Sequence, residues 1–181
     1  MRKGGLVPDE IVIEMLKNRI KNKDCQKGFI LDGFPRTITQ AEKLAEISDI
    51  DIVINMCVPD EIIIKRLSSR ITCQDCGEIF NLTDIQPKKE GTCDKCQGKV
   101  IRRADDEPEI VKKRLTTYRE QTFPLINFYK NKGILQDIVC NNISQPADET
   151  AQQVLNSILN FAKNTTSSNL SSQLLSQPSS L

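Results

Sequence analysis

Two pairs of cysteines carry the clearest chemical signal in this chain. Each pair has the spacing C-x-x-C, and the four residues are Cys73, Cys76, Cys93 and Cys96. The short gap lets both thiolates of a pair face one ion, and four thiolates complete the tetrahedral coordination that Zn²⁺ prefers. Because cysteine fills all four positions, none is left open for water, so the predicted zinc site is structural. Four reduced thiols and a disulfide framework are the alternatives.

The surroundings of the cysteines favour the metal. The segment between the pairs is polar, so we expect zinc to replace a hydrophobic core there. Gly77 and Gly98 follow the two pairs, where a tight turn often needs a positive φ. The chain opens with no secretory pattern, and in a reducing compartment paired cysteines are more often metal ligands than disulfides. A cytoplasmic location is therefore expected.

Several arginines form a second group with chemical meaning. Arg36 follows the run FILDGFP, in which Asp32 ends an apolar stretch. The others flank or follow the cysteine segment: Arg66, Arg70, Arg103 and Arg114. The chain has no histidine, which makes a serine or cysteine triad unlikely on composition, whereas arginines suit phosphoryl transfer because they neutralise phosphate oxygens. For any single arginine, the alternative is that its side chain simply lies on the solvent-exposed face of a helix and binds no ligand.

The elements that must position these residues follow from the apolar pattern. We expect helices over residues 6–21, 39–47, 59–70, 106–132 and 147–163, and strands over 28–36, 50–58 and 134–140. The longest helix should bend or restart at Pro124, which has no amide donor. Strands that alternate with helices predict an α/β fold with a parallel sheet and flanking helices.

The bulk properties set further limits. With 181 residues the chain can form one ordinary domain with an insertion. Its 25 basic and 24 acidic residues nearly cancel, so neither nucleic acid nor an anionic membrane is expected as a partner. Residues 164–181 are rich in Ser, Asn and Gln and are expected to form a disordered tail, with a loosely docked terminus as the alternative.

Four motifs in a fixed order identify a family. They are GLVPDEIVI, GFILDGFPRT with Gln40, RLSSR followed by the cysteine pairs and RRADD, and KKRL. Together they resemble adenylate kinases of the zinc-containing bacterial type, over a stretch from Gly4 to about Lys163. The resemblance implies Mg²⁺-dependent phosphoryl transfer from ATP to AMP, giving two ADP, and a full-length protein that is a monomer. It implies the P-loop nucleoside monophosphate kinase fold, with the remainder of an AMP-binding arm at 1–22, a CORE at 23–70 and 107–163, and a mobile zinc LID at 71–106.

The same resemblance assigns roles to individual residues. AMP would contact Gly5, Leu6, Val7, Gly33, Phe34, Pro35, Arg36, Gln40, Arg103 and Arg114. Gln40 would read the adenine edge, and Asp32 would orient water around Mg²⁺. ATP would contact Arg66, Arg70, Ile79, Phe80 and Gln145. The catalytic set would be Arg36, Arg70, Arg103, Arg114 and Asp32, with Asp105 pairing nearby.

One motif of the family is not in this sequence. The family begins with a strand and a G-x-x-x-x-G-K loop whose amides and lysine hold the ATP phosphates. Met1 is therefore expected to be an internal methionine of a longer protein, and this chain an incomplete form that is weakly active or inactive. The missing strand would lie between residues 29–32 and 52–57, leaving a gap in the sheet. The alternative function is a non-catalytic zinc-stabilised module that binds a nucleotide or a protein.

Overall fold

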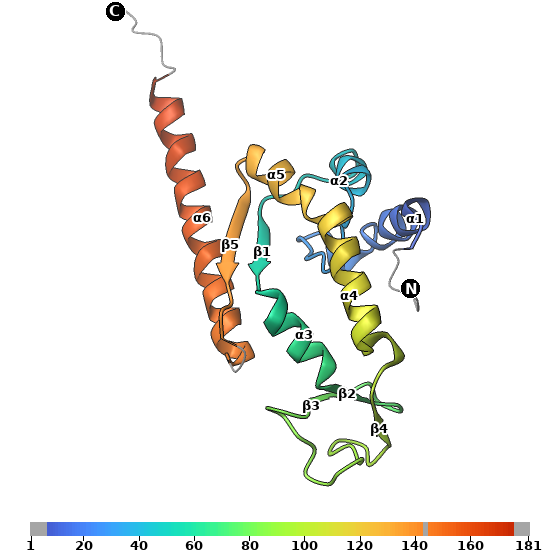
Figure 1. Cartoon of the computed structure of the whole chain (residues 1–181). Helices are drawn as coiled ribbons and strands as arrows, with labels where there is room; N and C mark the ends of the chain where they lie inside the picture. The colour runs from blue at the N-terminus through green and yellow to red at the C-terminus, as the bar shows by residue number, and fades with distance from the viewer. Residues whose placement is uncertain (1–6, 143–144, 176–181) are drawn as a thin grey trace, which may run out of the picture.

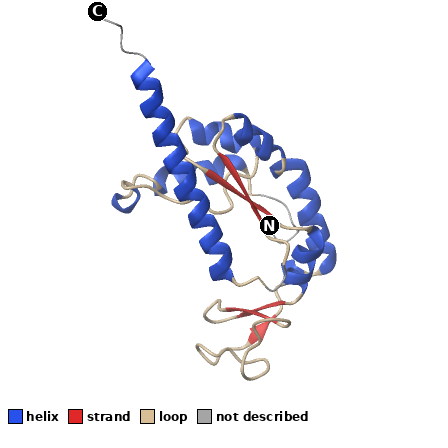
Figure 2. Cartoon of the chain, turned by 90° about the vertical axis from the view of Figure 1, so that its left-hand side faces the viewer, coloured by secondary structure: helices blue, strands red, loops and turns tan. Residues whose placement is uncertain are grey.

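Two parallel strands form the centre of the fold. The computed structural model describes residues 7–142 and 145–175, with side chains described up to residue 165. Strands β1 (Val53–Cys57) and β5 (Leu135–Val139) pair in parallel, from Val53 opposite Leu135 to Cys57 opposite Val139. Helices surround this pair (Figures 1 and 2). The predicted α/β class with a parallel sheet and flanking helices is confirmed.

The chain crosses from β1 to β5 through three helices. These are α3 (Asp60–Ser68), α4 (Pro108–Thr117) and α5 (Pro124–Asn131), and α6 (Ala147–Leu175) follows β5 and runs beside it (Figure 1). The helix expected over 106–132 is divided by a π-helical turn, Tyr118–Thr122, in which the N–H of Phe123 bonds to the carbonyl of Tyr118 at 2.8 Å. The wider turn precedes Pro124, whose ring would clash with the carbonyl four residues back in a regular helix.

Two further helices form the other side of the molecule. They are α1 (Asp9–Arg19) and α2 (Ile38–Ala45), which pack on one another, and α2 also packs on α5. Ala41, Leu125 and Tyr129 form the buried cluster between α2 and α5, with Val53 of β1 against it. This apolar contact ties the start of α2, and the loop before it, to the sheet.

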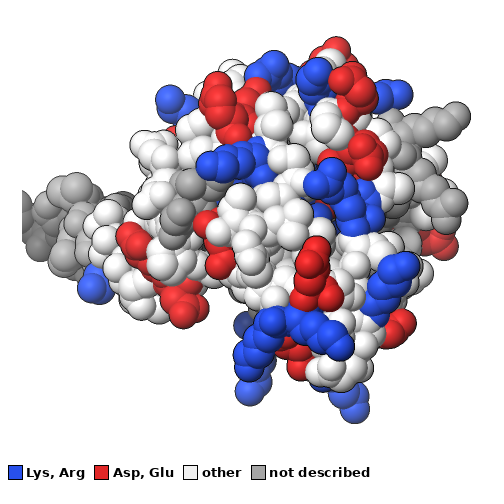
Figure 3. All heavy atoms as spheres, turned by 60° about the horizontal axis from the view of Figure 1, so that its bottom comes forward, with Lys and Arg blue, Asp and Glu red and all other residues white. Residues whose placement is uncertain are grey.

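The cysteine segment folds as a small antiparallel module. Its strands are β2 (Arg70–Cys73), β3 (Ile79–Asn81) and β4 (Val100–Ile101), in the order β3-β2-β4. A small buried cluster of Cys73, Phe80, Cys93 and Val100, with Ile71 packed against it, is the module's core. Figure 3 brings this end of the molecule forward and shows Lys and Arg side chains among Asp and Glu side chains.

Two expectations about elements differ from the structure. Residues 28–36 form no strand, and Ile30 is 93% exposed. A strand needs a hydrogen-bonded neighbour, and among the described residues β1 pairs with β5 alone, so no strand is paired with residues 28–36. The disordered tail is expected to begin at residue 164, whereas α6 continues as far as Leu175. Adding a residue to an existing helix costs less than starting a new one. Residues 176–181 lie outside the described part.

Candidate functional site

A cavity of about 890 Å³ opens where the two central strands end. Its walls come from the segments after β1 and β5, from α3, from α4 and from the π-helical turn. Most of the lining is apolar, and the charged side chains in it are Arg36, Asp60, Asp105, Arg114 and Arg119. Ligands of open α/β sheets bind at the carboxyl ends of the strands, so this cavity is the candidate site.

Arg36 is held by three neighbouring groups. Its backbone N–H donates to Gln40 Oε1 at 2.7 Å, and its carbonyl accepts from Thr122 Oγ1 at 2.8 Å. Its Nε donates to the carbonyl of Gly33 at 2.7 Å. Gly33 has a φ of +71°, and a Cβ there would lie 2.8 Å from the guanidinium of Arg36. The positive φ therefore favours glycine at this position, and its missing side chain leaves room for the guanidinium. Thr122 was not predicted, because only the tertiary fold brings it to Arg36.

Two arginines and two aspartates meet beside the cavity. Arg70 forms a bidentate ion pair with Asp106, at 2.8 and 2.5 Å, and the Asp106 side chain is fully buried. The hydrogen bond to Asp106 raises the pKa of Arg70 above its usual value. Arg114 lies 3.5 Å from Asp105 and 3.8 Å from Asp106. The sequence prediction named Asp105 and missed Asp106, although both acids stand just before the helix that starts at Pro108.

Other predicted residues lie apart from this cluster. Arg103 is half-buried and Asp32 is exposed, and neither lines the cavity. Arg66 donates to the carbonyl of Asn142 at 3.2 Å, and the N–H of Gln145 bonds to the same carbonyl at 3.4 Å. These two predicted ATP contacts are thus brought together, and the Nε2 of Gln145 is buried with no hydrogen-bond partner among the described residues.

The predicted AMP contacts are only partly described. Gly33, Pro35 and Arg36 line the cavity, and Phe34 is half-buried between them. Val7 is half-buried just before α1, whereas Gly5 and Leu6 lie outside the described residues. Gln40 is 3% exposed, and its Nε2 donates to Asp9.

The two residues expected to pack on ATP adenine face opposite ways. Ile79 is 52% exposed, whereas Phe80 is 5% exposed in the core of the cysteine module. Both belong to β3, and consecutive side chains of a strand point to opposite faces. Phe80 is therefore a core residue in this structure, and only Ile79 is available to a ligand.

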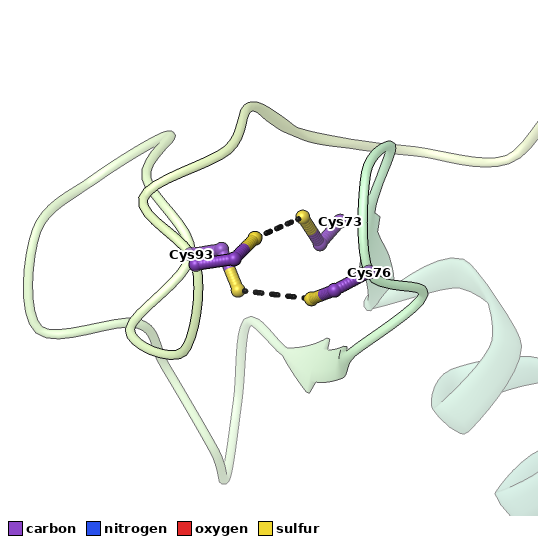
Figure 4. Close-up of side chains that lie close together, drawn as sticks. Cys73, Cys76 and Cys93 are labelled. Carbon is purple, nitrogen blue, oxygen red and sulfur yellow. Dashed lines mark hydrogen bonds between the residues drawn. The ribbon is translucent and has the colours of Figure 1, made fainter.

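The four predicted zinc ligands converge. Their sulfur atoms all lie within 4.8 Å of one another, with Cys73 and Cys96 at 3.4 Å and Cys76 and Cys93 at 3.6 Å (Figure 4). A tetrahedral ion with Zn–S bonds of about 2.3 Å would place neighbouring sulfurs about 3.8 Å apart. The cluster is the expected size for zinc, and the four cysteines are unpaired as disulfides.

The charge of the cluster also points to a cation. The backbone amide of Cys76 lowers the pKa of Cys73 to about 7. The amide of Gly98 lowers the pKa of Cys96, but the neighbouring Cys76 and Cys73 thiols outweigh it and raise that pKa to about 12. Crowded thiols cannot all ionise without a counter-charge. A divalent ion supplies that charge and deprotonates its ligands.

The turn after each cysteine pair differs from expectation at one position. Gly77 has the predicted positive φ, +74°. In the second turn, Gln97 takes this role with a φ of +66°, and Gly98 does not. Gly98 leaves room for the Asp75 carboxylate, which a Cβ at this position would contact.

The chain resembles proteins of one named family. A family model described as adenylate kinase matches residues 1–134. Curated adenylate kinases of Caldicellulosiruptor saccharolyticus and Methanosarcina barkeri are 55% and 54% identical over 140 residues, 75% of this chain and 65% of each relative. That of Caldicellulosiruptor bescii is 50% identical over 157 residues, 84% of this chain and 72% of the relative. The chain thus spans about two thirds of the length of the first two relatives.

Proposed function

The chain belongs to the adenylate kinase family, and on that premise we propose that its protein transfers a phosphoryl group reversibly between ATP and AMP, giving two ADP. The observation that carries the proposal is the cavity at the carboxyl end of β1, where Arg36 and Arg114 both reach the lining. Phosphoryl transfer requires mainly positioning and neutralisation of phosphate charge. Two guanidinium groups beside an apolar cavity provide both.

We assign the roles within the site from the geometry. Arg36, on a loop fixed at three points, would hold the AMP phosphate. Arg114 would neutralise charge that develops on the transferred group, with Asp105 orienting its guanidinium. Arg70 would reach a phosphate only by leaving Asp106, so we assign it first to anchoring the cysteine module. Arg103 would join the phosphates when that module moves toward the cavity.

The bases and ions are assigned in the same way. Val7, Phe34 and Pro35, with Gln40, would face the AMP base. Arg66, Ile79 and Gln145 would face the ATP base, and the buried Nε2 of Gln145, which has no partner within the described part of the chain, supports a ligand there. Mg²⁺ would arrive with ATP and neutralise its phosphates, and Asp32 would orient water around it. Zn²⁺ on the four cysteines would be structural.

The cellular location and the oligomeric state complete the proposal. Reduced cysteines that are paired for a metal suit a reducing compartment, so we place the protein in the cytoplasm, as a monomer in its full-length form. None of the helices among the described residues has the length and hydrophobicity of a bilayer span.

A coupled assay of ADP formation from ATP and AMP with Mg²⁺ tests the proposal. These 181 residues contain no G-x-x-x-x-G-K run, so we expect the chain itself to turn over slowly. A version extended at its N-terminus by the glycine-rich segment of a curated relative should be active. In that version Arg114→Met should lower kcat by about a hundredfold or more. Lys112→Met is the matched control, because Lys112 lies on the same helix and is 67% exposed.

The outcomes separate the two candidate functions. An extended version that binds AMP and ATP but forms no ADP would favour a non-catalytic nucleotide-binding module. Equal losses from Arg114→Met and Lys112→Met would refute the role of Arg114. Comparable turnover from the original and extended chains would mean that another part of the chain holds the ATP phosphates.

A further inference from the structure

A directional hydrogen-bond network joins the first turns of α1 and α2. The Asp9 carboxylate accepts from Gln40 Nε2 at 2.6 Å and from Thr37 Oγ1 at 3.0 Å. Thr37 is also the N-cap of α2, and its Oγ1 accepts from the backbone N–H of Gln40 at 3.1 Å. On its other side, Gln40 Oε1 accepts from the backbone N–H of Arg36 at 2.7 Å.

These partners fix which way the Gln40 amide points. A carboxylate can only accept hydrogen bonds, so Asp9 must face the NH₂ end of the amide. A backbone N–H can only donate, so Arg36 must face the oxygen end. A flipped amide would place oxygen against the carboxylate and NH₂ against an N–H, which loses both bonds and adds two repulsions. Gln40 is 3% exposed, so water cannot easily compensate.

The fixed amide keeps one free donor and one free acceptor. An amide has two N–H donors and two lone pairs on its oxygen, and Asp9 and Arg36 each use one. The remaining N–H donor and the remaining lone pair therefore have fixed relative positions toward a bound base. Adenine presents an acceptor, N1, beside an amino donor, N6, whereas guanine presents a donor, N1–H, beside an acceptor, O6. One amide orientation suits adenine, and the flipped orientation suits guanine.

We propose that Asp9 is a specificity-determining residue that acts through Gln40. It locks the amide in one orientation and so excludes the orientation that guanine needs. This inference rests on the proposed function, in which Gln40 faces the base of the acceptor nucleotide. If Asp9 only held α1 against α2, its loss would weaken the binding of AMP and GMP by the same factor. If Asp9 fixes the orientation of the Gln40 amide, its loss changes the ratio of the GMP Kd to the AMP Kd.

The test compares AMP and GMP binding to the 181-residue chain by calorimetry. In wild type, AMP should bind more tightly. Asp9→Ala should lower the ratio of the GMP Kd to the AMP Kd by about tenfold, the scale of one mismatched buried hydrogen bond. Asp9→Asn should also lower the ratio, because its amide can donate as well as accept and so tolerates either orientation of Gln40. Glu10→Ala, which removes the neighbouring acid in the same turn, is the control and should keep the ratio.

A second measurement reports on the lock without any ligand. In wild type, the Gln40 side-chain NH₂ protons should exchange slowly with solvent in NMR spectra, and in Asp9→Ala they should exchange fast. Gln40→Ala separates the role of Gln40 from that of Asp9. If Gln40→Ala removes the AMP preference and Asp9→Ala leaves it, the role of Asp9 is wrong and the role of Gln40 stands. A wild-type chain without preference overturns both, and slow exchange in Asp9→Ala overturns the lock itself.

Discussion

Replacing Asp106 by asparagine should destabilise the protein far more than the same change at its neighbour Asp105. Asp106 is fully buried and receives two hydrogen bonds from Arg70, whose side chain is 20% exposed. Removing one partner of a buried ion pair costs about 3–5 kcal/mol, because the other charge stays buried without compensation. Since asparagine keeps one acceptor and Arg70 keeps some contact with water, we expect the lower end, about 3 kcal/mol.

The neighbouring residue provides the matched control. Asp105 and Arg114 lie 3.5 Å apart, and their side chains are 41% and 39% exposed. An ion pair this exposed contributes less than about 1 kcal/mol, so Asp105→Asn should change the free energy of unfolding by no more than that. Each variant removes one negative charge, and the two positions are neighbours in the sequence, so the two variants differ mainly in the burial of the residue that is replaced.

Urea unfolding of the zinc-loaded protein measures both variants. The free energy of unfolding should fall by about 3 kcal/mol for Asp106→Asn. In the double variant Arg70→Met with Asp106→Leu, much of this loss should be recovered, because neither charge is then left alone. Equal effects of Asp105→Asn and Asp106→Asn, or a double variant as unstable as Asp106→Asn, would refute the reasoning.

Three further predictions concern the cysteine module. Gln97→Gly should raise stability by about 0.5–1 kcal/mol, because Gln97 has a φ of +66°; a lower melting temperature would contradict this. The apparent zinc affinity should fall from pH 8 to pH 6, because protons compete with the metal for thiols such as Cys73, whose pKa is about 7. Competition with a chromophoric chelator measures this affinity, and an affinity that does not change with pH would argue against thiolate ligands. Phe80→Ala should destabilise the module by about 3–5 kcal/mol, whereas Ile79→Ala should leave stability nearly unchanged and weaken ATP binding. Thermal melts and nucleotide titrations measure the two effects. A larger loss of stability in Ile79→Ala than in Phe80→Ala would contradict a buried Phe80 and an exposed Ile79.

Short sequence patterns predicted the helices, the strand and the cysteine cluster that depend on residues close together in the chain. The acids after Pro8 and Pro59 marked the starts of α1 and α3, and the apolar run around Val53–Cys57 marked β1. The cluster of four cysteines was equally predictable, because the C-x-x-C spacing is itself local. Pro124 indicated an interruption of the long helix, although not that it would take the form of a π-helical turn.

Contacts between distant segments could not be predicted in this way. The apolar run at residues 28–36 has strand composition, yet a strand exists only where another one pairs with it. Both Ile79 and Phe80 looked suited to a base, and only the pairing of β3 with β2 decides which of them is buried. The partner of Gln40 is Asp9, on another helix, whereas the sequence motifs alone assigned that amide entirely to a ligand.

The pairing of Arg70 with Asp106 also bears on how the chain can vary. These residues stand where the chain enters and leaves the cysteine module, 36 positions apart in sequence and joined by two hydrogen bonds. A segment whose two ends meet at one point can be lengthened, shortened or exchanged without moving the helices on either side. We therefore expect that the module between Arg70 and Asp106 can be replaced by a shorter loop while the rest of the fold stays intact, provided that these two residues are kept.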